Sequence, residues 1–219
     1  MPRLLFEKIG NAIWVSHLDL MLIFQRAFKR AGLPLRHTQG FNPRPSVSIA
    51  LPLSVGVESR CELLDFDLDN CDVSDAEIQE RLNRVLIEGV NILSVYSSGR
   101  KIRDLSLLQC CVALEFDNGI PQGATDAIRD LFKREEVLVS KKTKSGLQEQ
   151  NIIPMIRHLD VVEADSNTLH LQAMIACQNP TLNPIQLAQA VTLYLPHYKP
   201  DFYKCGRIEI YDFEEKVFR

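Results

Sequence analysis

Residues 38–46 read Thr38-Gln39-Gly40-Phe41-Asn42-Pro43-Arg44-Pro45-Ser46. This stretch separates a segment with helical periodicity from a short apolar segment, so it divides the first expected helix from the second expected strand. A plain connection needs one or two turn residues, whereas this one holds a glycine, two prolines, an aromatic residue and an arginine. The two prolines fix φ and remove two backbone donors. The sequence therefore predicts a stiffened loop that presents side chains.

The segment before the loop is predicted to be an amphipathic helix. Ser16, with Asp19 three residues later, indicates an N-cap, and Gly32 with Pro34 indicates the end of the helix near Ala31. One apolar stripe recurs at helical spacing through Leu20, Phe24, Ala27, Phe28 and Ala31. The polar side of the same helix is basic, with Arg26, Lys29 and Arg30.

The first half of the chain then follows the order strand, helix, strand, strand, helix, strand. Strands are expected over 3–8, 47–53, 61–68 and 92–96, and a second helix over 74–87. This is the split β-α-β order of a ferredoxin-like unit. Asp65, Asp67 and Asp69 alternate along the third strand, which favours a solvated sheet face over a metal site.

The second half repeats this order. Strands are expected over 107–116, 137–142, 168–177 and 207–213, a short helical turn and a strand within 152–162, and helices over 121–134 and 184–194. We therefore predict an α+β protein of two tandem ferredoxin-like units with antiparallel sheets. Residues 1–98 form the first unit with the 38–46 loop, and residues 106–219 form the second with a basic hairpin at 141–146.

Composition limits the functional classes. The chain has 219 residues, of which 46% are hydrophobic and 24% charged, which is typical of globular proteins. No apolar run approaches the roughly 18 residues of a membrane span, and the N-terminus does not resemble a signal peptide, so we expect a cytoplasmic protein without a membrane partner. The six cysteines contain neither C-x-x-C nor C-x-x-x-C-x-x-C, so we expect reduced thiols and neither a metal site nor a cofactor.

Charge is distributed unevenly along the chain. Residues 1–48 contain seven Lys and Arg against two acidic residues, a net charge of +5, whereas residues 49–100 contain four against ten, a net charge of −6. A nearly neutral protein can in this way present a basic face and an acidic face.

Several segments together carry a resemblance to a known family. They read Ser16-His17-Leu18-Asp19-Leu20-Met21, Arg30-Ala31-Gly32-Leu33-Pro34, Gln39-Gly40-Phe41-Asn42-Pro43-Arg44-Pro45 and Ala50-Leu51-Pro52-Leu53. The chain resembles the DUF2344 family, also called the radical SAM-linked proteins, over nearly its whole length. The resemblance implies a module that occurs alone or fused behind a radical SAM enzyme, and the missing cysteine triplet means that the chain is not that enzyme.

The candidate site residues come from the first helix, the shaped loop and the second-half hairpin. A ligand is expected to contact His17, Arg36, Gln39, Phe41, Asn42 and Arg44, with the start of the helix and the loop meeting in one basic pocket. Phe41 is interpreted either as a lid over the core or as a stacking platform for a base. Lys141, Lys142 and Lys144 are interpreted either as a solvated turn or as a finger that contacts phosphate.

Three functions remain open at this point. The first is a non-catalytic recognition module that binds RNA or another anionic ligand and acts with a radical SAM enzyme. The second is a metal-independent RNA-processing enzyme with His17 or His37 as proton carrier and Arg44 stabilising phosphate charge. The third is an adaptor whose acidic 58–80 region binds a basic partner, either a ribosomal component or the radical SAM enzyme itself. We predict the first of these, without a reaction.

Overall fold

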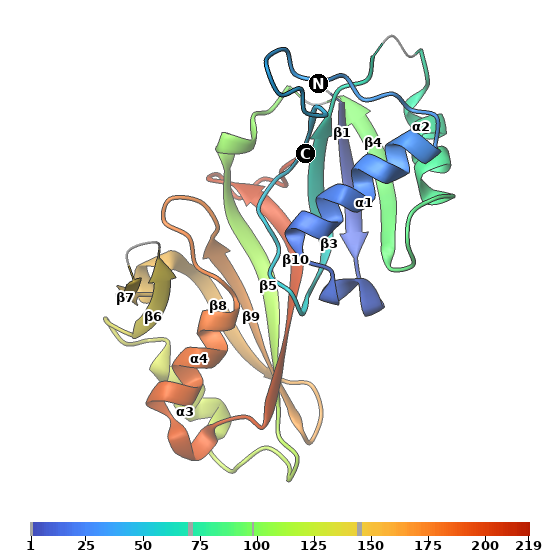
Figure 1. The fold of residues 1–219 in the computed structure, drawn as a ribbon. Coiled ribbons are helices and arrows are strands. Elements are labelled where there is room, and N and C mark those ends of the chain that lie inside the picture. The colour runs from blue at the N-terminus through green and yellow to red at the C-terminus, as the bar shows by residue number, and fades with distance from the viewer. Residues whose placement is uncertain (1, 70–71, 98, 144–145) are drawn as a thin grey trace. The chain divides into compact units, whose positions relative to one another are not determined.

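The structure, a computed structural model, describes residues 2–69, 72–97, 99–143 and 146–219. The chain divides into two compact units, residues 1–104 together with Arg219, and residues 105–218. Each unit contains an antiparallel sheet and two helices, so the predicted α+β class is confirmed (Figure 1).

The first unit is built on the strand order β4-β1-β3-β2, in which every neighbouring pair is antiparallel. Its elements are β1 (Pro2–Lys8), the 3-10 turn η1 (Gly10–Trp14), α1 (His17–Arg30), β2 (Val47–Ile49), β3 (Val57–Phe66), α2 (Asp75–Asn83) and β4 (Val90–Ser97). The predicted second helix ends four residues early, and the predicted strand at 47–53 shortens to three residues.

Helix α1 forms where its sequence signals place it. The Asp19 backbone N–H donates to Ser16 Oγ at 3.2 Å, and the Ser16 hydroxyl donates to Asp19 Oδ2 at 2.7 Å, which satisfies an otherwise unpaired donor of the first turn. Gly32 follows the helix with φ of +68°, a conformation that favours glycine. The predicted apolar stripe is confirmed, since Leu20, Phe24, Ala27 and Phe28 are buried.

The core of the first unit lies between its helices and one face of the sheet. Phe24 meets Phe6 of β1 edge to face at a centroid distance of 4.8 Å, and Phe28 meets Phe66 of β3 at 5.1 Å. Ile78 and Leu82 of α2 belong to the same buried cluster. Both helices therefore cover the same side of the sheet (Figure 1).

The second unit has the strand order β10-β5-β9-β8, again antiparallel throughout. A 3-10 turn, η2 (Ile102–Asp104), precedes it. Its elements are β5 (Leu105–Glu115), α3 (Ala124–Leu131), β6 (Leu138–Thr143), β7 (Gly146–Asn151), η3 (Ile153–Met155), β8 (Ile156–Glu163), β9 (Thr168–Ala176), α4 (Ile185–Tyr194), η4 (Pro196–Tyr198) and β10 (Phe202–Asp212). The last strand begins five residues earlier than predicted, and α3 is shorter at both ends.

One predicted strand belongs to a different sheet. The segment at 137–142 was expected in the main sheet of the second unit, but β6 pairs with β7 in a separate two-stranded hairpin. The place beside β9 is taken by β8, whose residues pair from Ile156↔Ile175 to Glu163↔Leu169. Alternation of side chains identifies a strand but does not identify its partner, which is the reason for the error.

The alternating aspartates of β3 and the residues that follow it also differ from the prediction of a solvated face. Asp65 pairs with the buried Arg3, and Asp67 pairs with Arg36 at 2.9 Å. Two members of the row are therefore partners in ion pairs that tie β3 to other parts of the first unit.

Candidate functional site: an aromatic and basic loop

The shaped loop is closed by backbone hydrogen bonds at its base. Arg36 N donates to Asp67 O at 2.8 Å, and Ser46 N donates to Arg36 O at 2.7 Å, so both ends of the loop are fastened beside the end of β3. An isolated bridge pairs His37 with Pro45. Residues 36–46, which we call the 36–46 loop, therefore form a loop whose base is closed by hydrogen bonds.

A second pair of hydrogen bonds stiffens the middle of the 36–46 loop. Thr38 N donates to Arg44 O at 2.8 Å, and Arg44 N donates back to Thr38 Oγ1 at 3.0 Å. Pro43 and Pro45 flank Arg44 and restrict its backbone. Gly40 has φ of +144°, a conformation that residues with side chains rarely adopt.

The tip of the loop presents its side chains to solvent. Phe41 is fully exposed, which excludes the interpretation of this ring as a lid over the core. Gln39 and Asn42 on either side are exposed as well. An exposed phenyl ring on a braced loop loses little conformational entropy when another flat ring stacks on it.

The two arginines of the loop have different roles. Arg36 forms an ion pair with Asp67 through Nη1 and Oδ2, so its charge is partly neutralised. Arg44 is exposed, and the described residues provide no acceptor for its guanidinium. His37, across the bridge from Pro45, is exposed too. Phe41, His37 and Arg44 therefore make an aromatic and basic surface on one loop.

His17 does not join this surface. It is the first residue of α1, whereas the loop follows the last residue of the helix. Because α1 has 14 residues, its two ends lie about 20 Å apart, and Figure 1 shows the chain leaving the helix at the end remote from η1. The structure therefore does not bring His17 and the loop into the single pocket that we expected, and His17 and His37 do not share a site.

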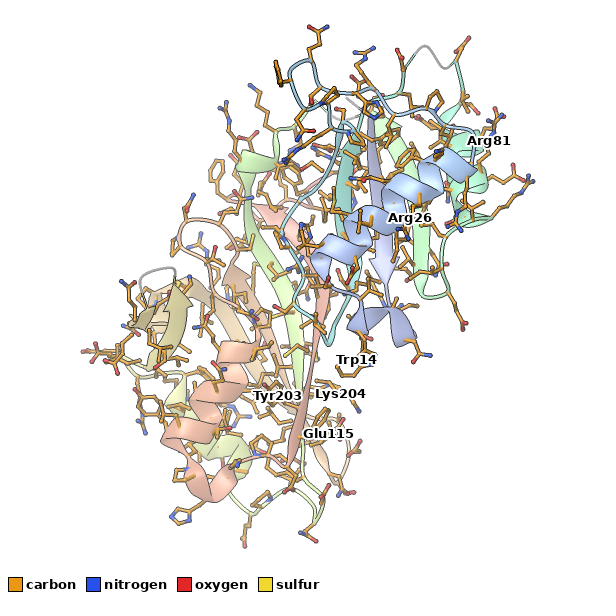
Figure 2. The ribbon with its side chains drawn as sticks, in the orientation of Figure 1. Trp14, Arg26, Arg81, Glu115, Tyr203 and Lys204 are labelled. Atoms are coloured by element: carbon orange, nitrogen blue, oxygen red, sulfur yellow. The ribbon has the colours of Figure 1, made fainter. Side chains whose placement is uncertain are left out.

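The outward side of α1 adds a second basic surface. Arg26 and Lys29 are exposed, while Arg30 donates through Nη2 to Val85 O at 2.7 Å. Leu18 and Leu22 precede these cations on the same stripe at spacings of three and four residues and are exposed, and Trp14 is exposed beside the start of the helix. Trp14, in η1, and Arg26, on α1, are labelled in Figure 2. The basic side of this helix is the one predicted from the sequence, whereas the exposure of Leu18 and Leu22 was not predicted.

The basic hairpin is only partly described. Lys141 and Lys142 lie within β6, not at the turn, and Lys141 Nζ donates to Thr181 O at 3.1 Å. The side chain of Lys142 and the whole of Lys144 lie outside the described residues. Lys141 is therefore held against the segment before α4 and does not extend from a hairpin tip.

A second exposed aromatic group lies at the start of β10. The rings of Phe202 and Tyr203 are stacked at 6.3 Å, and Lys204 Nζ lies 5.9 Å from the Phe202 ring centre. Lys204 also pairs with Glu115 at 2.6 Å, and these residues are labelled in Figure 2. Because its cation is neutralised within the pair, this group has less attraction for anions than the 36–46 loop.

Burial suppresses the reactivity of three of the cysteines, Cys110, Cys177 and Cys205. Burial raises the pKa of Cys110 and of Cys205 to about 12, and that of Cys177 to about 11. These thiols stay protonated at neutral pH and are poor nucleophiles. Cys71 lies outside the described residues. Across residues 2–69, 72–97, 99–143 and 146–219, no three His, Cys, Asp or Glu side chains gather in a way that could hold a metal ion.

Four acids of the 58–80 region form ion pairs within the first unit. Glu77 pairs with Arg81, and Glu80 pairs with Arg84, both one turn along α2. Two of its other acids, Asp65 and Asp67, pair with arginines as described above. Local pairing of this kind weakens the case for an acidic surface that binds a basic partner.

None of the described helices is both long enough and apolar enough to cross a bilayer.

Comparison with known proteins identifies the family of the chain and solved structures that are similar to it. The profile of the family described as "Uncharacterized protein conserved in bacteria (DUF2344)" matches residues 2–184. No curated protein matches the chain. Among solved structures, a chain in the crystal structure of a Cbf5-Nop10-Gar1 complex is similar with a TM-score of 0.52 and 9% identity, over 95% of this chain and 48% of that chain.

A second solved structure, the archaeal box H/ACA sRNP Nop10-Cbf5 complex, gives a TM-score of 0.48 at 9% identity, over 94% of this chain and 46% of that chain. The present chain thus spans about half the length of the chains that it resembles. At such low identity, the first of these similarities concerns the fold alone.

Proposed function

Because the chain belongs to the DUF2344 family, and because its 36–46 loop exposes an aromatic ring together with the side chains of His37 and Arg44, we propose that it is a non-catalytic module that recognises single-stranded RNA. The observation that carries the proposal is the full exposure of Phe41 on a loop braced at two levels. Every base offers a flat face, so a ring on a rigid support beside cations suits an unpaired strand.

Each exposed side chain of the loop has its own role in the proposed RNA recognition. Phe41 stacks on a base, and Arg44 contacts a backbone phosphate through its guanidinium. Gln39 and Asn42 lie next to the ring, where their amides are able to donate to and accept from a base edge. Arg26 and Lys29 on α1 add positive potential to the same unit.

The architecture is compatible with this function. We interpret each unit as ferredoxin-like, because four of its strands and two helices follow the split β-α-β order with the strand order 4-1-3-2. Four-stranded units of this kind are common in RNA recognition. The similar chain was crystallised in a Cbf5-Nop10-Gar1 complex, but fold likeness alone does not transfer a function.

Binding to a fluorescent single-stranded RNA, measured by anisotropy over a series of salt concentrations, tests the proposal. Phe41→Ala should weaken binding by about 1–3 kcal/mol, the contribution of one stacked base. Arg44→Gln should reduce the slope of log K against log salt by about 0.7, the value for one phosphate of a single strand. Matched controls are Phe213→Ala, an equally simple loss of an exposed ring, and Arg103→Gln.

The proposal fails if the wild-type chain does not bind RNA even at low salt, or if Phe213→Ala weakens binding as much as Phe41→Ala. The second result would mean that exposed rings bind without specificity. None of the substituted side chains belongs to the core, so each variant should fold. A separate unfolding curve for each variant checks this.

The family resemblance further implies a radical SAM enzyme as partner, and we propose that the module delivers bound RNA to it. A tagged chain should copurify with that enzyme in low salt, and nuclease treatment separates a direct contact from one bridged by RNA. An RNA-bridged association would disappear after nuclease treatment, whereas a direct one would persist.

A further inference from the structure

A cavity of about 390 Å³ lies in the second unit, between β6 and the beginning of α4. It is lined by Ser140, Lys141, Thr181, Asn183, Ile185, Gln186 and Gln189. Its volume falls in the range of sites that hold small organic molecules. The lining contains one cation, six uncharged residues and no carboxylate, so the cavity favours a ligand that bears negative charge.

The cation is fixed at the cavity by its surroundings. Lys141 Nζ donates to Thr181 O at 3.1 Å, and Gln150 Nε2 donates to the same oxygen at 3.3 Å. An ammonium group has three donors, and the single carbonyl uses one of them. Lys141 is therefore positioned by the protein and retains donors for a ligand.

The buried side-chain amide of Gln186 gives a second, independent indication of a ligand in the cavity. Its residue is only 6% exposed, and its Oε1 accepts from Asn183 N at 3.1 Å. Its Nε2, however, is buried without a hydrogen-bond partner in the part of the chain that the structure describes. Buried amide donors in folded proteins are nearly always satisfied. Gln186 also lines the cavity, so a ligand oxygen would supply the missing acceptor once the amide turns towards the cavity.

The start of α4 contributes positive electrostatic potential, but its first backbone N–H groups are not free to donate to a ligand. Ile185 N donates to Asn183 Oδ1 at 3.1 Å, and Gln186 N donates to Asn183 O at 2.9 Å, so these first-turn amides are already used. The dipole of the ten-residue helix still favours an anion near its first turn. Side chains rather than backbone amides must therefore hold the ligand.

We propose that this cavity binds a small phosphorylated molecule of mononucleotide size through its phosphate. Lys141, Gln186 and Ser140 are able to donate to different phosphate oxygens, and Ile185 offers an apolar contact to the rest of the molecule. The site belongs to the second unit and uses no residue of the 36–46 loop, so it goes beyond the RNA recognition proposed above.

Titration calorimetry and two-dimensional amide NMR on the full chain, with inorganic phosphate, adenosine monophosphate and adenosine as probes, test this inference. The two phosphate-bearing probes should bind and shift the signals of Ser140, Lys141 and Gln186, whereas adenosine should not. The inference is overturned if none of the probes binds, or if adenosine binds as tightly as its monophosphate.

Two substitutions locate the binding in the cavity. Gln186→Glu keeps an oxygen to accept from Asn183 N but replaces the unpartnered donor by a negative charge, so binding of the monophosphate should weaken at least about tenfold. Lys141→Gln should weaken it similarly, and it decides the question if Gln186→Glu fails to fold. Lys199→Gln, an exposed lysine away from the cavity, should leave binding unchanged.

Unchanged affinity in both cavity variants would overturn the site. The Phe41→Ala chain should bind the monophosphate with wild-type affinity, so a failure of RNA recognition and a failure of the phosphate site give different results.

Discussion

Arg3 and Asp65 form a two-point ion pair between neighbouring strands of the first unit. Arg3 Nε lies 2.6 Å from Asp65 Oδ1, and Arg3 Nη2 lies 3.1 Å from Asp65 Oδ2. Arg3 is only 2% exposed and also donates through Nη2 to Arg100 O at 3.1 Å. The pair is directly opposed in the β1–β3 register, so it fixes the alignment of the two strands.

Removal of one partner from this pair should be costly. Asp65→Ala removes this two-point carboxylate partner from a buried guanidinium, and we expect the free energy of unfolding to fall by about 3–5 kcal/mol. Urea unfolding followed by circular dichroism measures the change. Glu80→Ala removes an exposed partner of Arg84 and should cost no more than about 1 kcal/mol. Equal losses in the two variants would contradict this account.

Local signals in the sequence were sufficient for the helices but not for the site. The spacing of Leu20, Phe24 and Phe28 and the N-cap Ser16 identify α1 because both depend only on residues a few positions apart. The expected meeting of His17 with the loop depended on which end of α1 the loop approaches. That is decided by the antiparallel pairing of β2 with β3, which periodicity does not report.

Exposure was equally difficult to predict from single residues. Phe41 and Phe28 are the same residue type, yet one is fully exposed and the other fully buried. The composition of the loop predicted its stiffness, but not the direction of the ring. Gln186 shows the reverse case, because an amide in a helix gives no sequence signal for burial, and only the packing around α4 hides it.

Bracing of the 36–46 loop should affect binding more than stability. Thr38→Val removes the hydroxyl that accepts from Arg44 N but keeps the shape of the side chain. Because the lost bond is exposed, we expect the unfolding free energy to change by less than about 1.5 kcal/mol. RNA affinity should nevertheless fall about threefold or more, since a looser loop loses more entropy on binding.

Anisotropy titration and urea unfolding of the same Thr38→Val preparation separate these two effects. Ser48→Val, another exposed hydroxyl in the first unit, is the control and should leave RNA affinity unchanged. Unaltered affinity in Thr38→Val would show that the hydrogen bond does not preorganise the loop for binding.

The buried thiols should resist modification in the native protein. The pKa of Cys110, Cys177 and Cys205 is raised by burial, so little thiolate is present near neutral pH. We expect iodoacetamide at pH 8 to label these three only after unfolding in urea. Peptide mass spectrometry identifies the labelled positions, and rapid native labelling of Cys110 would contradict the structure.

The same shifts set the direction of a pH effect on stability. The folded chain holds these thiol protons more tightly than the unfolded chain, whose thiols titrate near 9.0. Their contribution to stability is therefore complete below about pH 9 and declines as pH rises towards 12. In urea unfolding at pH 7 and pH 10 with a reductant present, Cys110→Ala should lose less stability between the two pH values than the wild type.

The Tyr194 hydroxyl of α4 forms hydrogen bonds with the backbone of the β6–β7 hairpin. Leu138 N donates to Tyr194 Oη at 2.9 Å, and Tyr194 Oη donates to Leu138 O at 3.3 Å, while Arg134 lies 5.7 Å from the ring centre. Tyr194→Phe keeps the ring and its contact with Arg134 but leaves both backbone groups of Leu138 without this partner. We expect a loss of about 1–3 kcal/mol, the cost of unpaired buried polar groups.

Hydrogen exchange distinguishes local loosening from general destabilisation in the Tyr194→Phe chain. The amides of β6 and β7 should exchange faster, whereas those of β1 and β3 in the first unit should keep their wild-type rates. Because Lys141 lies on β6, the same substitution should also weaken binding of adenosine monophosphate in the cavity beside α4. Faster exchange across both units would show instead that Tyr194 supports the whole fold and does not dock the hairpin in particular.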